Sequence, residues 1–278
     1  MLFFERLEAP FLFAATTLYL VAMLLLWTQL FLWPESDEKA TRRTPGDWGR
    51  ALLWLGAILH LGALAGQGPQ LFLMKAGVAG LFGWILIVSY LVIGRKMGVG
   101  SGSIVAPVAL VAALYSLAAP KLHLYTPQSR LDAMWISAHV FIVLSGYVAL
   151  AFAFTASLLY FVQEGLLKRK KLNGLWHKLP PLRVADEWIY RATAFGLALL
   201  TLGLITGIAF SALHDPTYAA LRDPKVLFSG ATWAIFSVYI VTRARLGWHG
   251  RKSNLVVIYG FVVMAISFFG VQHLVPSP

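Results

Sequence analysis

The chain has 278 residues, of which 59% are hydrophobic and only 13% charged, and its mean hydropathy is +0.72. A soluble domain would carry about a quarter charged residues, so we predict an all-α, polytopic membrane protein with one transmembrane domain. The absence of cysteine excludes disulfides, thiolate zinc sites and iron–sulfur clusters. The net charge of +11 lies in loops between apolar stretches, which indicates lipid headgroups and topology signals rather than nucleic acid.

Eight apolar stretches are predicted to span the membrane, because a helix of about 20 residues crosses a ~30 Å hydrocarbon core. The first is interpreted as a retained helix, since it is too long for a signal peptide and no cleavage site follows it. The fourth stretch is the shortest, and the alternative interpretation of it is a re-entrant segment that does not cross the membrane. The predicted spans are 11–33, 50–66, 71–94, 104–119, 133–163, 189–213, 226–242 and 254–275.

Basic residues are concentrated in alternate loops of this arrangement. The loops within 34–50, 95–96, 164–188 and 243–252 hold 16 of the Lys and Arg residues, whereas the other loops and the N-terminal segment hold 5. The positive-inside rule then places both termini outside, and we expect a multi-pass protein of the inner (cytoplasmic) membrane. The basic inner loop 164–188 is the predicted contact for a membrane or cytoplasmic partner.

Three histidines within or near the spans are candidate ligands. By residue count, His60 lies ~15 Å from the inner side of the second span, and His139 lies ~10 Å from the outer side of the fifth. At similar depth the two imidazoles could reach one metal centre, and imidazole suits haem iron. The alternative for each is a hydrogen-bonded packing residue. His273, near the outer end of the last span, is a third candidate ligand or an interfacial side chain.

Other residues have more ordinary interpretations. Lys75 either extends its ammonium to the outer headgroups or pairs with a carboxylate such as a haem propionate. His214 is expected to be solvated in an outer loop. Gly196, Gly203 and Gly207 permit close helix approach in the sixth span. The predicted spans contain no carboxylate, which argues against a proton-coupled transporter. The sequence also shows no nucleophile–base pair of the kind that an enzyme would use.

Several sequence stretches together resemble a known family. They are Leu59-His60-Leu61 with Trp84, Ser137-Ala138-His139-Val140 with Ser145-Gly146-Tyr147, Pro180-Pro181-Leu182 through Tyr190-Arg191 to Gly207, Thr232-Trp233 through Arg243, Gly247 to Lys252, and Phe268-Phe269-Gly270. The chain resembles the cytochrome c assembly protein family of haem-handling membrane proteins, the CcsA, CcmC and HemX type. The outer segment 214–225 lacks tryptophan, which favours the HemX-like branch, because haem-delivering members carry a tryptophan-rich segment.

The resemblance implies a non-enzymatic, integral membrane protein that binds or handles haem in cytochrome c biogenesis or haem metabolism. Haem b would be the cofactor, with its iron held by His139 and His60, His273 as a further ligand, and Lys75 at a propionate. The lipid bilayer and haem are the expected partners. The alternative is a non-haem membrane scaffold or regulatory partner on the same fold.

Overall fold

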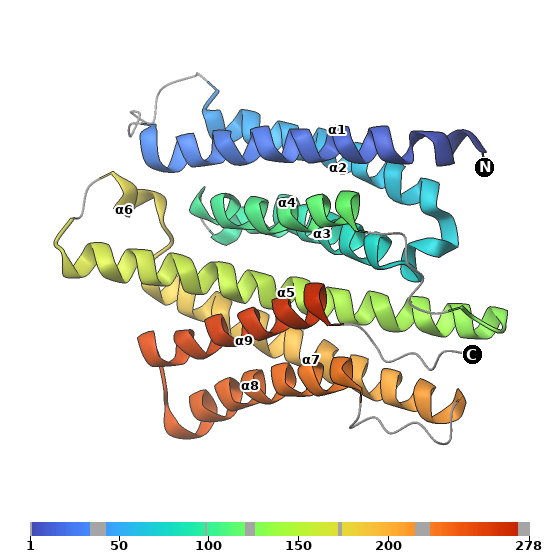
Figure 1. The fold of residues 1–278 in the computed structure, drawn as a ribbon. Coiled ribbons are helices and arrows are strands. Elements are labelled where there is room, and N and C mark those ends of the chain that lie inside the picture. Colours follow the sequence, from blue (N-terminus) through green and yellow to red (C-terminus); the bar gives the residue numbers. More distant parts are fainter. Residues whose placement is uncertain are drawn as a thin grey trace. The chain divides into compact units, whose positions relative to one another are not determined.

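The computed structural model describes residues 2–33, 43–97, 99–119, 126–171, 174–214 and 223–271. The regular elements within these ranges are helices, as Figure 1 shows. Seven of the described helices are long and apolar enough to cross a membrane, which confirms the prediction of a polytopic helical bundle. The fourth predicted span is a shorter apolar helix of 17 residues, about 26 Å long. The candidate ligand His273 lies outside the described residues.

The chain divides into two compact units. The first comprises Met1–Leu71, Ala76–Lys121 and Leu158–Ala185, and the second comprises Phe72–Lys75, Leu122–Ser157 and Asp186–Pro278. The longest helix contributes residues to both units. A single transmembrane domain remains a prediction.

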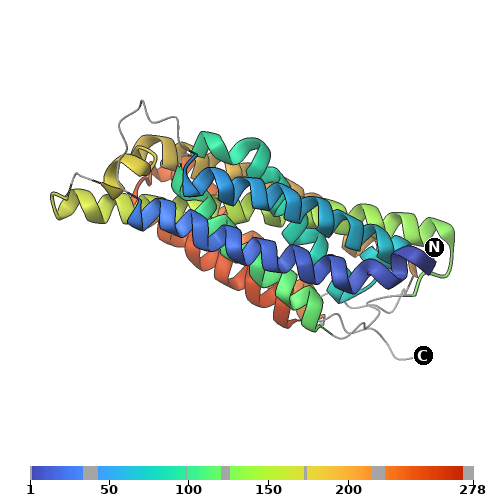
Figure 2. The same ribbon diagram turned by 90° about the horizontal axis from the view of Figure 1, so that it is seen from above.

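The first unit is built around the neighbouring helices α1 and α2, which run antiparallel (Figures 1 and 2). Helix α1 also packs against α4. The ring of buried Tyr19 lies against α2 at Gly56, where an added Cβ would come within 2.7 Å of Tyr19 Cε1. Helix α2 begins with a capping box between Thr44 and Asp47, which satisfies backbone donors of its first turn. The elements of this unit are α1 (Leu2–Trp27), η1 (Thr28–Leu32), α2 (Pro45–Gln67), η2 (Gly68–Phe72), α3 (Lys75–Ile93), η3 (Gly94–Met97), η4 (Val99–Ser101), α4 (Gly102–Ala118) and α6 (Leu175–Lys178). The last residue of η2, Phe72, and the first residue of α3, Lys75, belong to the second unit.

Part of the basic segment 164–188 is anchored within this unit. Lys178, at the end of α6, donates from Nζ to the carbonyl oxygens of Gln29 (3.0 Å), Leu30 (3.2 Å) and Trp33 (2.5 Å). The last carbonyls of a helix have no partner within it, and a lysine is well suited to bind them. Leu179 packs in the same place against Leu30. The segment around α6 therefore belongs to the packed unit.

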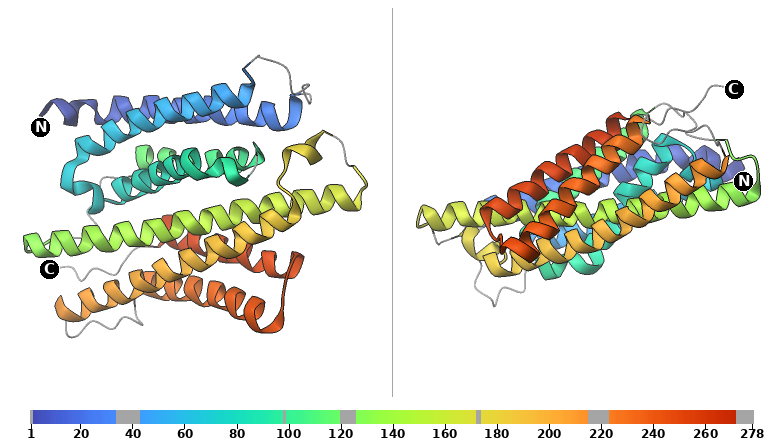
Figure 3. Two further views of the ribbon diagram at one scale, coloured as in Figure 1. Left: turned by 180° about the vertical axis from the view of Figure 1, so that it is seen from behind. Right: turned by 90° about the horizontal axis from the view of Figure 1, so that it is seen from below.

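The second unit contains most of the remaining helices. Helices α8 and α9 lie side by side in Figure 3. Helix α8 ends at Gly247, whose φ of 62° is the left-handed conformation that glycine adopts readily. The helices of the second unit are α5 (Arg130–Lys168), α7 (Leu182–His214), α8 (Pro224–Leu246) and α9 (Arg251–Gly270). The last residues of α5 and the first residues of α7 belong to the first unit.

Glycines bring α5 and α7 close together. A Cβ at Gly196 would lie 3.0 Å from the carbonyl oxygen of Gly146, and one at Gly203 would lie 2.5 Å from Val143 Cγ2. Small residues at such crossings let helix backbones approach within a membrane. The predicted packing role of these glycines in α7 is therefore confirmed.

An ion pair joins α7 to α8. Arg243 Nη1 lies 2.9 Å from Asp186 Oδ1, and Nη2 lies 2.6 Å from Oδ2. The two side chains are only 12% and 19% exposed, and the guanidinium also lies 5.0 Å from the ring centre of Tyr190. This two-bond geometry is the strong form of an arginine–carboxylate pair.

Candidate functional site

His139 lies on α5 at the contact with α7. Its Nδ1 is 3.0 Å from the hydroxyl oxygen of Thr206. Its Cε1 lies against Gly207, where an added Cβ would come within 2.9 Å. The ring is half-buried. Contacts at Nδ1 and at Cε1 therefore hold the predicted ligand in one orientation.

His139 belongs to a row of polar contacts between these two helices. Asp132, Trp135 and His139 are spaced three and four residues apart, which places them on one face of α5. Trp135 Nε1 donates to the backbone carbonyl of Thr206 at 3.2 Å. Asp132 Oδ1 lies 3.1 Å from Nε2 of His214. The row thus extends from the first turn of α5 down to His139.

The prediction that His214 is solvated is confirmed, because the residue is exposed, but the prediction that it lies in a loop is wrong. It is the last residue of α7 and stacks on Phe210, with ring centres 4.0 Å apart. Its Nδ1 faces the carbonyl of Phe210 and its Nε2 faces Asp132. With oxygen acceptors at both nitrogens, the ring is suited to the doubly protonated form. The spacing of the polar residues in α5 was the available signal, but it does not identify a partner on another helix.

His60 is fully buried within the first unit. Its Nδ1 lies 3.3 Å from the hydroxyl of Tyr19, a contact between α2 and α1 that the sequence did not reveal. Its Nε2 is enclosed and has no hydrogen-bond partner among the residues that the structure describes. A buried nitrogen of this kind has donor chemistry suited to a metal.

The surroundings of His60 limit what its Nε2 can bind. A Cβ at Gly80 of α3 would lie only 3.3 Å from Nε2 and 2.9 Å from Ser116 Oγ. A flat macrocycle needs space along the whole face of the ring that binds its iron. Ligation by Nε2 therefore requires α2 and α3 to separate, and His60 as an iron ligand remains a prediction.

Two lysines lie near one another in the second unit. Lys75 is the first residue of α3, and its charge acts on Lys225 near the start of α8. Lys225 Nζ donates to the carbonyl of Ser267 at 2.6 Å, and Asp223 caps the same helix. The carboxylate of Asp223 also acts on Lys225, with the opposite charge, and balances part of this positive charge. Lys225 was missed as a partner of Lys75 because the two are far apart in the sequence.

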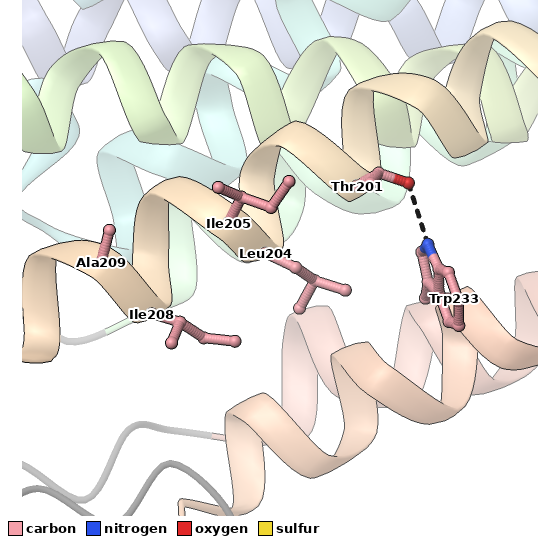
Figure 4. A pocket seen from close by; sticks show the side chains of 6 residues that line it. All are labelled: Thr201, Leu204, Ile205, Ile208, Ala209 and Trp233. Atoms are coloured by element: carbon pink, nitrogen blue, oxygen red, sulfur yellow. Dashed lines mark hydrogen bonds between the residues drawn. The ribbon is translucent and has the colours of Figure 1, made fainter.

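An apolar groove runs along α7 next to α8, as Figure 4 shows. Trp233 Nε1 donates to Thr201 Oγ1 across it at 2.9 Å. Successive helical residues turn by about 100°, which places the groove-lining Leu204 and Ile208 on the side of α7 away from Thr206. The groove is therefore separate from the His139 contact. Its volume is about 500 Å³, and it is lined by Thr201, Leu204, Ile205, Ile208, Ala209 and Trp233.

Comparison with known proteins identifies the family. Residues 73–276 match the family model described as cytochrome C assembly protein. The chain belongs to the cytochrome c assembly protein family. The matched region contains His139, Thr206 and Lys75, whereas His60 precedes it. The predicted family resemblance is thus confirmed, and the contact between α5 and α7 lies within the part that the cytochrome c assembly family shares.

Curated relatives agree with this assignment. A "Cytochrome c biogenesis protein CcsA" of Lolium perenne is 31% identical over 117 residues, covering 41% of this chain and 36% of the relative. The protein of the same name in Chlamydomonas reinhardtii is 28% identical over 175 residues, covering 62% and 48%. An uncharacterized 28.8 kDa protein of Azospirillum brasilense is 31% identical over 142 residues, covering 51% and 52%. The chain thus spans about half or less of these relatives, and no solved structure matches it at a comparable level.

Proposed function

We propose that this membrane protein binds haem and handles it during cytochrome c assembly, and that His139 would hold the haem iron. The observation that carries the proposal is the fixed position of His139, whose Nδ1 contacts Thr206 and whose Cε1 rests on Gly207. Family membership and the cytochrome c biogenesis names of its relatives support it. When bound, haem supplies an iron that accepts imidazole nitrogen. The residues of this chain hold and orient it, and no catalytic step is proposed.

The other ligand positions are part of the same proposal. Haem b is the proposed form, with His60 or His273 as the second iron ligand. Lys75 is the proposed partner of a propionate, and the nearby charge of Lys225 supports an anion at this place. The residues offer imidazole for iron and ammonium for carboxylate, which is the donor set that haem requires.

The finer placement within the family is also proposed. The outer segment 214–225 contains no tryptophan, which favours the HemX-like branch. The distribution of basic residues favours the inner (cytoplasmic) membrane with both termini outside.

Purification in detergent tests haem binding directly. We expect the protein to show a Soret absorption band after expression or after titration with haemin. The band should fall several-fold in His139→Ala, because the residue proposed to hold the iron is lost. His177→Ala is the matched control, since His177 is exposed and should leave the band unchanged. A colourless protein that takes up no haemin would contradict the proposal and favour the non-haem scaffold, and an unaltered band in His139→Ala would remove His139 as the ligand.

The basic inner loop is a second place for an experiment. We propose that its exposed residues Arg169, Lys170 and Lys171 contact an acidic membrane or cytoplasmic partner. Replacing all three by glutamine should remove crosslinks to that partner in intact membranes. Lys178→Gln is the control, because Lys178 is engaged with α1 carbonyls. Unchanged crosslinks in the triple variant would overturn this assignment.

A further inference from the structure

We infer that Thr206 is a positioning residue that sets the tautomer of His139, so that Nε2 is the nitrogen that binds iron. The inference rests on the proposed function, because it assigns the ligating atom of the same histidine. It concerns Thr206 itself, a residue that contacts the imidazole and not the iron.

The argument begins with the single proton of the threonine hydroxyl. Thr206 Oγ1 lies 2.9 Å from the carbonyl oxygen of Leu202 and 3.1 Å from that of Gly203. Carbonyl oxygens only accept hydrogen bonds, so the hydroxyl proton is directed to them. Towards Nδ1 of His139, 3.0 Å away, Oγ1 then presents a lone pair. This arrangement favours the tautomer in which the imidazole carries its proton on Nδ1 and donates it to Thr206.

The tautomer determines which nitrogen can bind a metal. A neutral imidazole has one N–H and one lone pair, so a proton on Nδ1 leaves the lone pair on Nε2. Metal-binding histidines commonly donate their other N–H to a nearby oxygen, which fixes the ring and raises its basicity as a ligand. Thr206 has this relation to His139.

A second contact from α5 holds the same residue of α7. Trp135 Nε1 donates to the backbone carbonyl of Thr206, one helical turn before His139. Gly207 follows immediately and leaves room for the imidazole. Thr206 is thereby held through its backbone while its hydroxyl orients the ring. The short sequence Gly203-Leu204-Ile205-Thr206-Gly207 supplies both the close approach and the acceptor.

The test compares Thr206→Val with Thr206→Ser. Valine keeps the shape but removes the acceptor, and the affinity for haemin should fall about 10- to 100-fold, the usual effect of losing an outer partner of a metal ligand. Serine should restore affinity. Thr201→Val is the matched control, because Thr201 accepts from Trp233 on the other side of α7 and its loss should leave haemin affinity unchanged.

A haem-free measurement gives an independent readout. In protein labelled with 15N-histidine, with His139→Gln used for assignment, NMR should show the His139 proton on Nδ1. Thr206→Val should lose this preference, and Thr206→Ser should keep it. Because the wild-type tautomer is read without any variant at Thr206, misfolding of Thr206→Val would leave the test intact.

The outcomes separate the inference from the proposed function. If His139→Ala binds haemin as the wild type does, the proposed function of His139 fails. If His139→Ala loses haemin but Thr206→Val retains full affinity, the positioning role of Thr206 fails. A wild-type His139 protonated on Nε2 would also overturn the inference.

Discussion

Replacing Asp186 with asparagine should lower the free energy of unfolding by about 3 kcal/mol, the lower end of the range for removing one partner of a buried ion pair. Asparagine keeps the shape of the side chain but removes the charge that balances Arg243. The guanidinium is only 12% exposed, so water cannot fully replace the lost carboxylate. SDS-induced unfolding followed by circular dichroism would measure the change.

The neighbouring carboxylate provides the control. Glu187 pairs with Arg191, but these side chains are 54% and 72% exposed. Exposed pairs contribute about 0–1 kcal/mol, so Glu187→Gln should change the unfolding free energy by no more than that. Equal losses in the two variants would show that burial does not distinguish the pairs.

Gly196→Val should destabilise the contact between α5 and α7 by about 1–3 kcal/mol, the usual cost of overpacking. A Cβ there would lie 2.8 Å from Leu150 Cγ and 3.0 Å from the Gly146 carbonyl. The leucine side chain can move, but the backbone oxygen moves only if the helices separate. The same unfolding measurement in detergent checks this expectation.

A glycine in open space separates this packing effect from helix propensity. Gly165 lies in α5, and a Cβ added there would meet none of the described atoms within 4 Å. Alanine is preferred over glycine in a helix by about 1 kcal/mol, so Gly165→Ala should stabilise or leave stability unchanged. If Gly196→Val left the free energy of unfolding unchanged, the close approach of α5 and α7 at Gly196 would be contradicted.

The positions of the long helices could be predicted from the sequence because lipid imposes long apolar stretches. The stretch 226–242, for example, lies within α8 (Pro224–Leu246). Helix ends were less predictable. Helix α5 continues to Lys168, beyond the predicted end at 163, because hydropathy reports lipid contact while helical hydrogen bonding continues into polar residues. The Lys168–Glu164 pair, at 2.8 Å, supports that last turn.

The candidate site was predictable only in part. His139 was predicted as a candidate ligand because an imidazole within a span needs a partner, and its role as an iron ligand stays a prediction. Its contact with Thr206 was not predicted, because two residues 67 positions apart meet only once α5 and α7 cross. The glycines of α7 indicated that another helix packs closely against it, but they did not show which residues of that helix would face them. Tyr19, the partner of His60, was missed for the same reason.

The hydrogen bonds of Lys178 bear on where a reporter protein can be inserted. Around Lys170, whose backbone has a φ of 54°, the side chains are exposed, and a fusion there would disturb little of the first unit. An insertion within α6 would withdraw an ammonium from the carbonyls that end η1. Topology reporters and affinity tags for this protein therefore belong at the end of α5.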